Sequence, residues 1–534
     1  MKNSLLDFIR SFENFTKTKM MKWILFLFFF SGIILFTGDV YAQNGSNPER
    51  LTLEEVIDLA ITGSSSAKYT QNQNVNYYWR YRNYKTRFRP QLTLNGDVPN
   101  YSHTTQPITQ PDGSIQFKQV SNLAASAVLS LNQSIPQLGT NIWASTSAYG
   151  IQNLNKDEIS FSGSPFTVGF SQPLFAYNWM KWYRKTEPMI YDEAQKRFIQ
   201  QIEEIALNTT HRYFNYLMVL TNFRLAENNL KNSLDNLKIS ETKKKLGQIS
   251  DNDFSRIELS VLNAQKALNQ ASMDLKNTDF ELKRYVGLDQ SMNVDLIIPL
   301  NIRFFDIDLD MAVTKARENR LETTLYQRQL INADRALAEA KNSTGLSTTL
   351  RGSFGLSSSA ESFMGIYEQP ERDRMLRISL SIPILDWGRS ASTVKLAESE
   401  RELTIYNVNK DIEEFDRSVI VQVEQFSLLK DQLVTADEAD KVAENGYQIA
   451  LRKFQNGELS ITDLNIALQE REQAKRDYIR SVQSYWVAFY RLRVLTLYDF
   501  ENNSNITYGN PMLDERAERM GLQTRELNRY YKEQ

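Results

Sequence analysis

Two stretches in the second half of the chain alternate apolar and polar residues with a period of two. The first places apolar or small side chains at Leu346, Thr348, Leu350, Gly352, Phe354 and Leu356, and the second at Leu376, Ile378, Leu380, Ile382 and Ile384. Weaker versions occur in the first half, around residues 92–94, 125–131, 142–148 and 166–170. This period predicts strands with one apolar and one polar face, as in a transmembrane β-barrel wall. A soluble β-sandwich with one buried face gives the same alternation.

Two longer segments, about residues 185–246 and 391–454, have the apolar seam of a coiled coil; in the first segment the mean step is about 3.5 when Thr209 and Glu227 are counted in the gaps. The first seam consists of Ile202, Ile205, Tyr213, Tyr216, Leu220, Phe223, Leu230, Leu234 and Leu237, and the second of Ile412, Phe415, Val419, Phe426, Leu433 and Tyr447. A helix of about 60 residues measures roughly 90 Å. We therefore predict two unusually long helices, with the aromatic residues used for packing.

The sequence contains an internal repeat. Gly247–Phe254 and Gly457–Leu464 share the pattern G-x-[IL]-S-x-x-D-[FL], and Ser171–Phe175 and Ser381–Leu385 share a Ser-x-Pro pattern, both at an offset of 210. A weaker match pairs residues 53–60 with residues 309–316 at an offset of 256. The difference, 256 − 210 = 46, places about 46 extra residues in the first copy, before its Ser-x-Pro strand. They form either longer surface loops or an additional hairpin.

These matches predict two repeats, each containing a helix, strands, a long helix and a further helix. The first repeat covers residues 43–290 and the second residues 309–497, with a linker at 291–308 and a polar tail at 498–534. The shared motifs supply turn residues at both ends of the long helices. The helix-tip turns are Gly247, Ser250, Asp253, Gly457 and Ser460, and the strand-to-helix turns are Pro173 and Pro383. Glycine ends a helix, S-x-x-D starts the next one, and proline redirects a strand.

Composition narrows the function. The 534 residues carry 62 Lys+Arg and 64 Asp+Glu, which argues against a nucleic-acid binder. Cysteine is absent and only two histidines occur, so disulfides, thiolate metal sites and histidine-based catalytic sites are not expected. No cluster of polar residues suggests a cofactor or catalytic site. We expect no enzyme, no metal and no cofactor.

The N-terminus has the features of an export signal. Basic residues precede an apolar run from Trp23 to Phe36, and Val40-Tyr41-Ala42 offers a signal-peptidase site, so the mature chain would begin at Gln43. Residues 1–42 are thus predicted as a signal peptide, with Met20 or Met21 as alternative starts. The run is short for a membrane span, although an uncleaved anchor is the other interpretation.

Taken together, these motifs resemble the TolC family of outer-membrane efflux proteins. The resemblance rests on Leu51–Ala60, the two Ser-x-Pro strand ends, Asp386-Trp-Gly388-Arg389 and Phe454–Leu464, and covers about residues 51–497. It implies an α+β membrane protein, a homotrimer in which an outer-membrane β-barrel segment continues into a long periplasmic α-helical coiled-coil barrel. The first repeat departs from the pattern, because Ala176-Tyr-Asn-Trp179 replaces Asp-x-Gly-x-Arg.

The resemblance also implies a function and partners. The chain would form a passive trimeric outer-membrane exit duct for a multi-component efflux or type I secretion system. A periplasmic adaptor protein and an inner-membrane pump would open its periplasmic end, and outer-membrane lipid would surround its strands. The alternative is a periplasmic coiled-coil adaptor or scaffold anchored at the inner membrane. Cleavage after Ala42 distinguishes the two, since such an adaptor keeps its anchor. The cargo is not indicated.

The family's periplasmic entrance is narrowed by aspartates, and the resemblance places one of them at Asp463. The second falls on Ile466, and the tyrosine and arginine that brace the closed gate fall on Phe454 and Leu459. We therefore expect a gate with at most one ring of carboxylates, held more by packing than by ion pairs. Asp463 as a helix cap alone is an equally supported interpretation.

Overall fold

The computed structural model describes residues 49–299 and 302–513. The predicted signal peptide and its cleavage site, and the last part of the polar tail, lie outside the described residues. Residues 50–299 and 302–513 belong to one compact unit, so the two predicted repeats are not separate bodies. None of the described helices combines the length and the apolar character that a membrane crossing requires.

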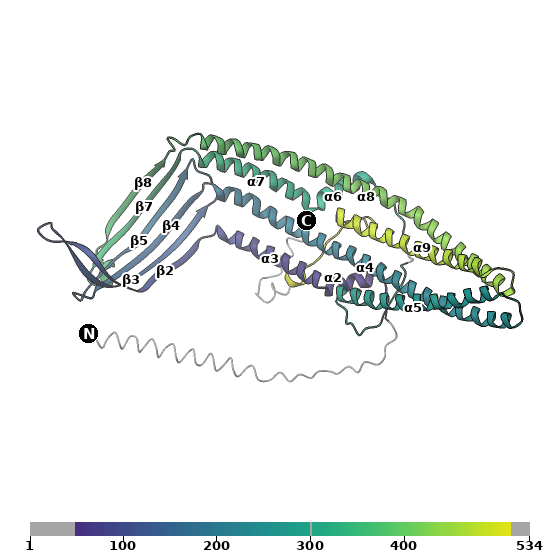
Figure 1. The fold of residues 1–534 in the computed structure, drawn as a ribbon. Coiled ribbons are helices and arrows are strands. Elements are labelled where there is room, and N and C mark those ends of the chain that lie inside the picture. Colours follow the sequence, from purple (N-terminus) through teal and green to yellow (C-terminus); the bar gives the residue numbers. More distant parts are fainter. Residues whose placement is uncertain (1–48, 300–301, 514–534) are drawn as a thin grey trace. The chain divides into compact units, whose positions relative to one another are not determined.

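The order of elements runs through two similar halves (Figure 1). The first half contains β1 (Glu49–Leu51), α2 (Leu53–Gly63), α3 (Ser65–Arg87), β2 (Gln91–Thr109), β3 (Ile115–Ile135), β4 (Thr140–Asn153), β5 (Glu158–Leu174), α4 (Trp179–Lys245) and α5 (Asp251–Val286). The second contains β6 (Val294–Leu296), α6 (Leu309–Asn319), α7 (Leu321–Ser343), β7 (Ser347–Ala360), the short helix η1 (Met364–Tyr367), β8 (Glu371–Ser381), α8 (Arg389–Asn456), α9 (Ile461–Thr496), β9 (Tyr498–Asp499) and β10 (Ser504–Asn505). The α2/α6, α3/α7, α4/α8 and α5/α9 pairs have nearly equal lengths, with 67 and 68 residues in the longest pair.

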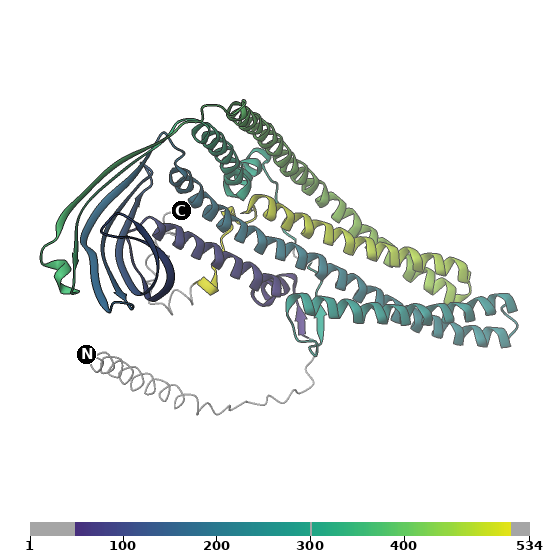
Figure 2. The same ribbon diagram turned by 60° about the vertical axis from the view of Figure 1, so that its left-hand side comes forward.

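Six strands form one antiparallel sheet in the order β2-β3-β4-β5-β7-β8 (Figures 1 and 2). Each strand pairs with the next over most of its length, with register shifts between Asp97 and Asn100, between Ser145 and Ser147, and between Gly163 and Phe166. The first half supplies four of these strands and the second half two. The extra residues of the first copy therefore add a hairpin to the sheet rather than longer surface loops.

Neither face of this sheet is covered by a second sheet or by a long helix among the described residues. Apolar side chains of the alternating pattern are consequently exposed in the single chain: Leu92 is 67 % exposed, Leu376 73 % and Ile378 68 %. A β-sandwich would bury this face, so the sandwich interpretation is wrong.

The start of the first long helix was expected near Lys185, and this boundary is wrong. Helix α4 begins at Trp179, where the Asn178 side chain accepts hydrogen bonds from the backbone N–H groups of Met180 and Lys181. Pro188 therefore lies inside the helix. Proline removes one backbone hydrogen bond there, but packing against other helices maintains the helix.

The helices share one core that centres on α4. Tyr213, Phe214 and Leu217 are fully buried, and the Tyr213 hydroxyl donates to the Leu51 carbonyl at 3.1 Å. Burial raises the pKa of Tyr213, because the phenolate is poorly solvated there. These contacts hold the N-terminal segment and the middle of the long helix together.

The predicted seam of α4 is right in its first half and wrong at Leu234 in its second. Ile202, Ile205, Tyr213, Tyr216 and Leu220 are buried. Further along, Leu234 is 41 % exposed, whereas Ser233 and Ser240 are buried at 7 % and 2 %. The helix therefore turns a polar stripe toward its neighbours near its tip.

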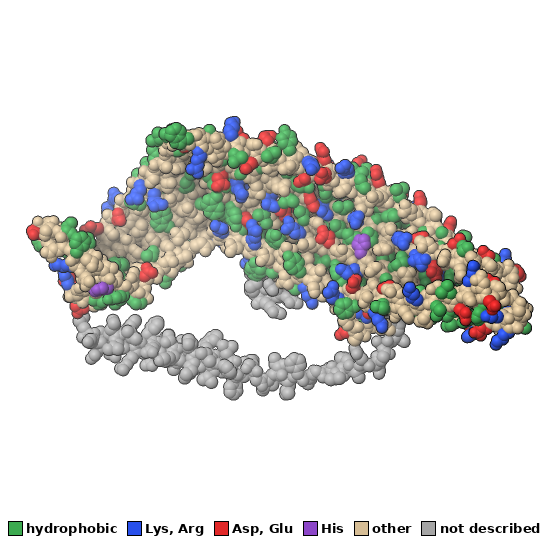
Figure 3. All heavy atoms as spheres, in the orientation of Figure 1, with side chains coloured by type: hydrophobic (Ala, Val, Ile, Leu, Met, Phe, Trp, Pro, Cys, Tyr) green, Lys and Arg blue, Asp and Glu red, His purple; other side chains and the backbone are tan. Residues whose placement is uncertain are grey.

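Part of the polar tail is ordered against the helices. The Asn510 amide donates to the Gln71 carbonyl and to the Asn74 side chain, and Asn510 is buried. The Tyr508 hydroxyl donates to Glu203, whose carboxylate also accepts two hydrogen bonds from Arg493 at 2.8 and 2.9 Å. The described tail residues thus pack on the helices. Charges of both signs are mixed over the helical surface seen in Figure 3.

Candidate functional site at the helix tips

The two helix tips have the same local structure. Gly247 and Gly457 have φ of 71° and 83°, the left-handed conformation that glycine adopts with least strain. The N–H of the residue that follows each glycine donates to a carbonyl of the last helical turn, at 2.9 Å in both cases. These contacts end α4 and α8 in the manner of a Schellman motif.

Each second helix then starts at a serine cap. Ser250 accepts from the backbone N–H of Asp253 at 3.1 Å, and Ser460 accepts from that of Asp463 at 3.2 Å. In both tips the serine hydroxyl also donates to the aspartate carboxylate at 2.7 Å. The second contact differs from a full capping box, in which the acidic side chain would bind the serine backbone N–H.

Asp463 is therefore a cap residue in this structure, and its side chain is exposed. Ile466 is exposed as well, at 49 %. Phe454 is buried, and it forms an apolar cluster with Tyr447 and Leu464 against which Leu459 packs. The ammonium group of Lys243 lies 5.7 Å from the centre of the Phe454 ring, which links the two tips. Of the four predicted gate residues, Phe454 and Leu459 thus pack in the apolar cluster, whereas Asp463 and Ile466 are exposed.

Each tip joins two helices into a helical hairpin, α4 with α5 and α8 with α9. A polar contact that the sequence patterns did not predict joins these two helical hairpins near the tips. The Asn232 side chain on α4 donates to the hydroxyl of Tyr447 on α8 at 3.1 Å. The guanidinium of Arg471 on α9 lies 4.1 Å from the centre of the Tyr447 ring, and Glu444 is 3.8 Å from Arg471. We call Asn232, Tyr447 and Arg471 the hairpin bridge. Burial raises the pKa of Tyr447, so the hydroxyl stays protonated at neutral pH.

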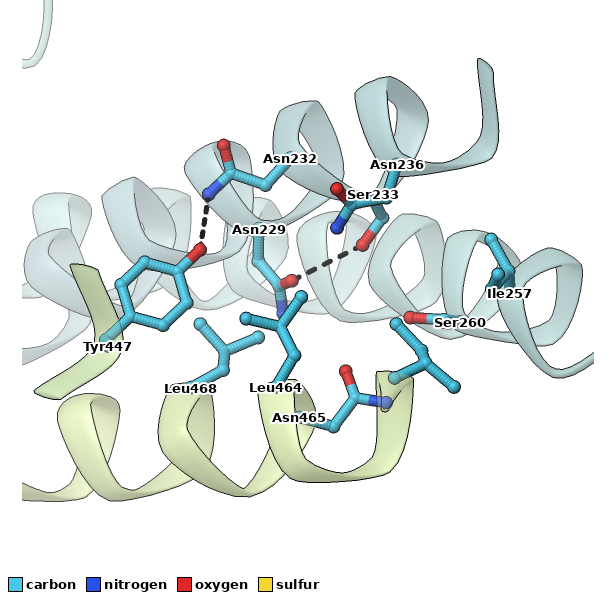
Figure 4. A pocket seen from close by; sticks show the side chains of 11 residues that line it. Asn229, Asn232, Ser233, Asn236, Ile257, Ser260, Tyr447, Leu464, Asn465 and Leu468 are labelled. Atoms are coloured by element: carbon cyan, nitrogen blue, oxygen red, sulfur yellow. Dashed lines mark hydrogen bonds between the residues drawn. The ribbon is translucent and has the colours of Figure 1, made fainter. Parts of the chain in front are cut away.

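The bridge borders a small polar cavity between the hairpins (Figure 4). Its lining is rich in amides and hydroxyls, supplied by Asn229, Asn232, Ser233, Asn236, Ser260 and Asn465. The Ser233 hydroxyl is 3.5 Å from the Asn229 side-chain oxygen (Figure 4). The spacing of three and four between Asn229, Asn232, Ser233 and Asn236 is the sequence signal that could have revealed this stripe.

The bridge lies seven residues before Phe454, about two helical turns from the tip. The expectation of a gate held by packing stays a prediction. The structure places an apolar cluster around Phe454, and Tyr447 of the same cluster also accepts a hydrogen bond from Asn232 of the other hairpin.

The opposite ends of the long helices are built by different residues in the two halves. Asp386 accepts from the N–H groups of Gly388 and Ser390, at 3.1 and 2.9 Å, before α8. These hydrogen bonds, chiefly those from Ser390, lower the pKa of Asp386. In the first half Asn178 takes this role. Pro173 is still paired within β5, opposite Thr349, whereas Pro383 follows the end of β8.

Within the described part of the chain, no group of three or more acidic or histidine side chains could hold a metal ion. His103 is paired on the sheet, with Nδ1 2.7 Å from the Ser121 hydroxyl.

Comparisons with known proteins agree with this architecture. Residues 313–496 match the family described as outer membrane efflux protein. No curated protein matches the chain.

Three solved structures illustrate the similarity of fold. The CmeC outer membrane channel of Campylobacter jejuni has a TM-score of 0.59 at 14 % identity, with 87 % of this chain and 88 % of that chain covered. The outer membrane protein VceC of Vibrio cholerae has 0.58 at 12 %, covering 83 % and 95 %. The MtrE outer membrane channel of Neisseria gonorrhoeae, in its open state, has 0.57 at 13 %, covering 85 % and 89 %. The resemblance to the TolC family of outer-membrane efflux proteins is thereby confirmed, by family over residues 313–496 and by fold over most of the chain.

Proposed function

We propose that this chain is an outer-membrane efflux channel that works as a passive homotrimeric exit duct. The observation that carries the proposal is an apolar belt on one face of the uncovered sheet. One row of directly opposed residues, which share this face over β2–β7, consists of Leu92, Leu131, Ala144, Val168 and Phe354. On β8 this row ends at Arg374, and the belt shifts toward the helices, where Leu376 and Ile378 stand opposite Gly352 and Leu350. The neighbouring row, on the other face, consists of Thr93, Ser130, Ser145, Thr167 and Gly355. One face thus suits lipid and the other a water-filled lumen.

The sheet leads directly into the long helices, so the same chain can provide both a membrane wall and a periplasmic tunnel. Strand β2 follows α3, β5 precedes α4, β7 follows α7 and β8 precedes α8. Three copies would surround one lumen, closed at the helix tips. A periplasmic adaptor and an inner-membrane pump, of an efflux or type I secretion system, would open those tips by separating the hairpins.

The adaptor alternative accounts less well for the sheet. A scaffold in the periplasm would leave the apolar belt in water, where large exposed apolar patches are unfavourable. An enzyme has no support either, since the family and the similar structures are channel proteins.

Cell fractionation tests the proposal. We expect the protein in the outer membrane, beginning at Gln43, and migrating as a species of about three chains unless boiled. Retention in the inner membrane with residues 23–36 still attached would refute the duct and favour the adaptor.

The role of Asp463 has a matched control inside the chain. Asp253 and Asp463 make the same cap contacts, so Asp253→Ala and Asp463→Ala remove equivalent hydrogen bonds. If Asp463 forms a ring of carboxylates at the entrance, only Asp463→Ala lowers the cation selectivity of single channels. Equal, small effects of both substitutions would show that Asp463 is a cap alone.

A further inference from the structure

The first half contributes four strands and the second half two, and this asymmetry bears on the width of the duct. The additional pair, β3 and β4, lies between β2 and β5 and is hydrogen-bonded on both sides. Its apolar residues continue the belt, because Leu131 stands opposite Leu92 and Ala144 opposite Val168. The extra hairpin is therefore part of the wall and not an appendage on it.

The helices below the sheet explain why a wider wall fits. Helices α3, α4, α7 and α8 lie side by side in that order, which is the order of the strands attached to them. At about 8–10 Å per helix, the four helices span an arc of roughly 32–40 Å. Strands about 4.8 Å apart and tilted by about 40° occupy roughly 6 Å each along the circumference. Four strands would cover only about 25 Å, whereas six cover about 38 Å.

The edges of the sheet are the second observation. Within the described residues, β2 and β8 each pair on one side only. Unpaired edges with apolar side chains recruit another strand. The Gln91–Asp97 part of β2 has no proline, whereas Pro99 and Pro107 lie further along the strand. Proline cannot donate to a neighbouring strand, so only the part next to the helices is suited to pairing.

The two edges also match in the direction of their side chains. Leu376, Ile378 and Leu380 of β8 carry the apolar pattern, as Leu92 and Leu94 do on β2. Side chains of one face must stand opposite one another, so a register that places Leu380 opposite Leu92 joins the two apolar faces. It also places Ile378 opposite Leu94.

We propose that β8 of one copy pairs with the Gln91–Asp97 segment of β2 of the next copy, and that three copies close a ring of eighteen strands, six from each chain. The proposal rests on the proposed function. A ring of eighteen strands is about 1.5 times as wide as one of twelve, the number that two strands per repeat would give, because diameter grows roughly linearly with strand number. The ring of strands would then have about the same width as the ring of helices where the two meet.

Engineered disulfides test the closure, since the natural chain has no cysteine. In the double variants Leu92→Cys/Leu380→Cys and Leu94→Cys/Ile378→Cys, we expect oxidation to convert the chain into covalent trimers on non-reducing gels. The matched control is Val168→Cys/Leu380→Cys, because β7 separates β5 from β8 within the chain. It should give no interchain product.

The outcomes separate this proposal from the proposed function. A heat-sensitive outer-membrane trimer that forms no disulfide in either pair would refute the closure while the duct stands. Covalent dimers as the final product would give twelve strands and refute the count. End-on electron micrographs of the oxidised particles should show a ring about 1.5 times as wide as a twelve-stranded barrel imaged alongside. Absence of any outer-membrane oligomer would refute both proposals.

Discussion

In the proposed duct, Tyr447→Phe should raise the fraction of open channels by removing the hydrogen bond that joins the two hairpins. Phenylalanine keeps the buried ring, and hence the contact with the Arg471 guanidinium 4.1 Å from its centre. The hydrogen bond from Asn232 to the hydroxyl, 3.1 Å long, is lost. The bond joins neutral groups in a partly buried place, so its net contribution is about 1 kcal/mol.

The size of the effect depends on how many bridges break together. About 1 kcal/mol corresponds to a fivefold change in the ratio of open to closed channels. If all three bridges of a trimer break in one step, the changes multiply to about 100-fold. The measurement is the open fraction of single channels in planar bilayers, for the natural protein and the variant.

A matched control is Tyr326→Phe. Its hydroxyl donates to the Asp411 carbonyl at 3.4 Å, joining α7 and α8 away from the tips. We expect no change in its open fraction. Equal open fractions for Tyr447→Phe and the natural channel would refute the role of the bridge. Asn232→Ala should have the same effect as Tyr447→Phe, and combining the two should add little, because both remove one contact.

Three further predictions concern stability and pH. Glu203→Gln removes one of the two carboxylates that pair with the largely buried Arg493 guanidinium and leaves Asp499 as the other, so it should destabilise the fold by about 2–3 kcal/mol and lower the temperature at which helical circular dichroism is lost. Gly457→Ala and Gly247→Ala should each cost about 1 kcal/mol in the same melts, because the open space around both glycines leaves backbone strain at positive φ as the main cost. The pKa of Asp386 is lowered in the folded chain, so the stability that its carboxylate contributes is fully present above the unfolded pKa of about 4. This contribution is lost as the pH falls through the lowered folded pKa. A pH series of melts should therefore show less acid sensitivity in Asp386→Asn than in the natural chain.

Features that depend on near neighbours could be predicted from the sequence. Gly247 and Gly457 end helices, and Ser250 and Ser460 begin them, because each contact joins residues that are at most five positions apart. The alternation of residues 346–357 likewise fixed the two faces of β7.

What depends on distant packing could not be predicted. Tyr447 and Asn232 are 215 residues apart, and only the packing of α4 against α9, which itself packs on α8, makes them partners. Packing near the tip also turns Ser240 inward and Leu234 outward, and packing against α3 and α7 at the other end accompanies the helical conformation of α4 through Pro188.

The sequence by itself determined the elements, their caps and the two-faced character of the strands, because these follow from the backbone and from residues a few positions apart. The tertiary structure alone decided that the extra residues of the first half join the sheet and which polar groups link the hairpins. Both depend on hydrogen bonds and contacts between segments that are far apart in the chain, and a local pattern does not specify which segments meet.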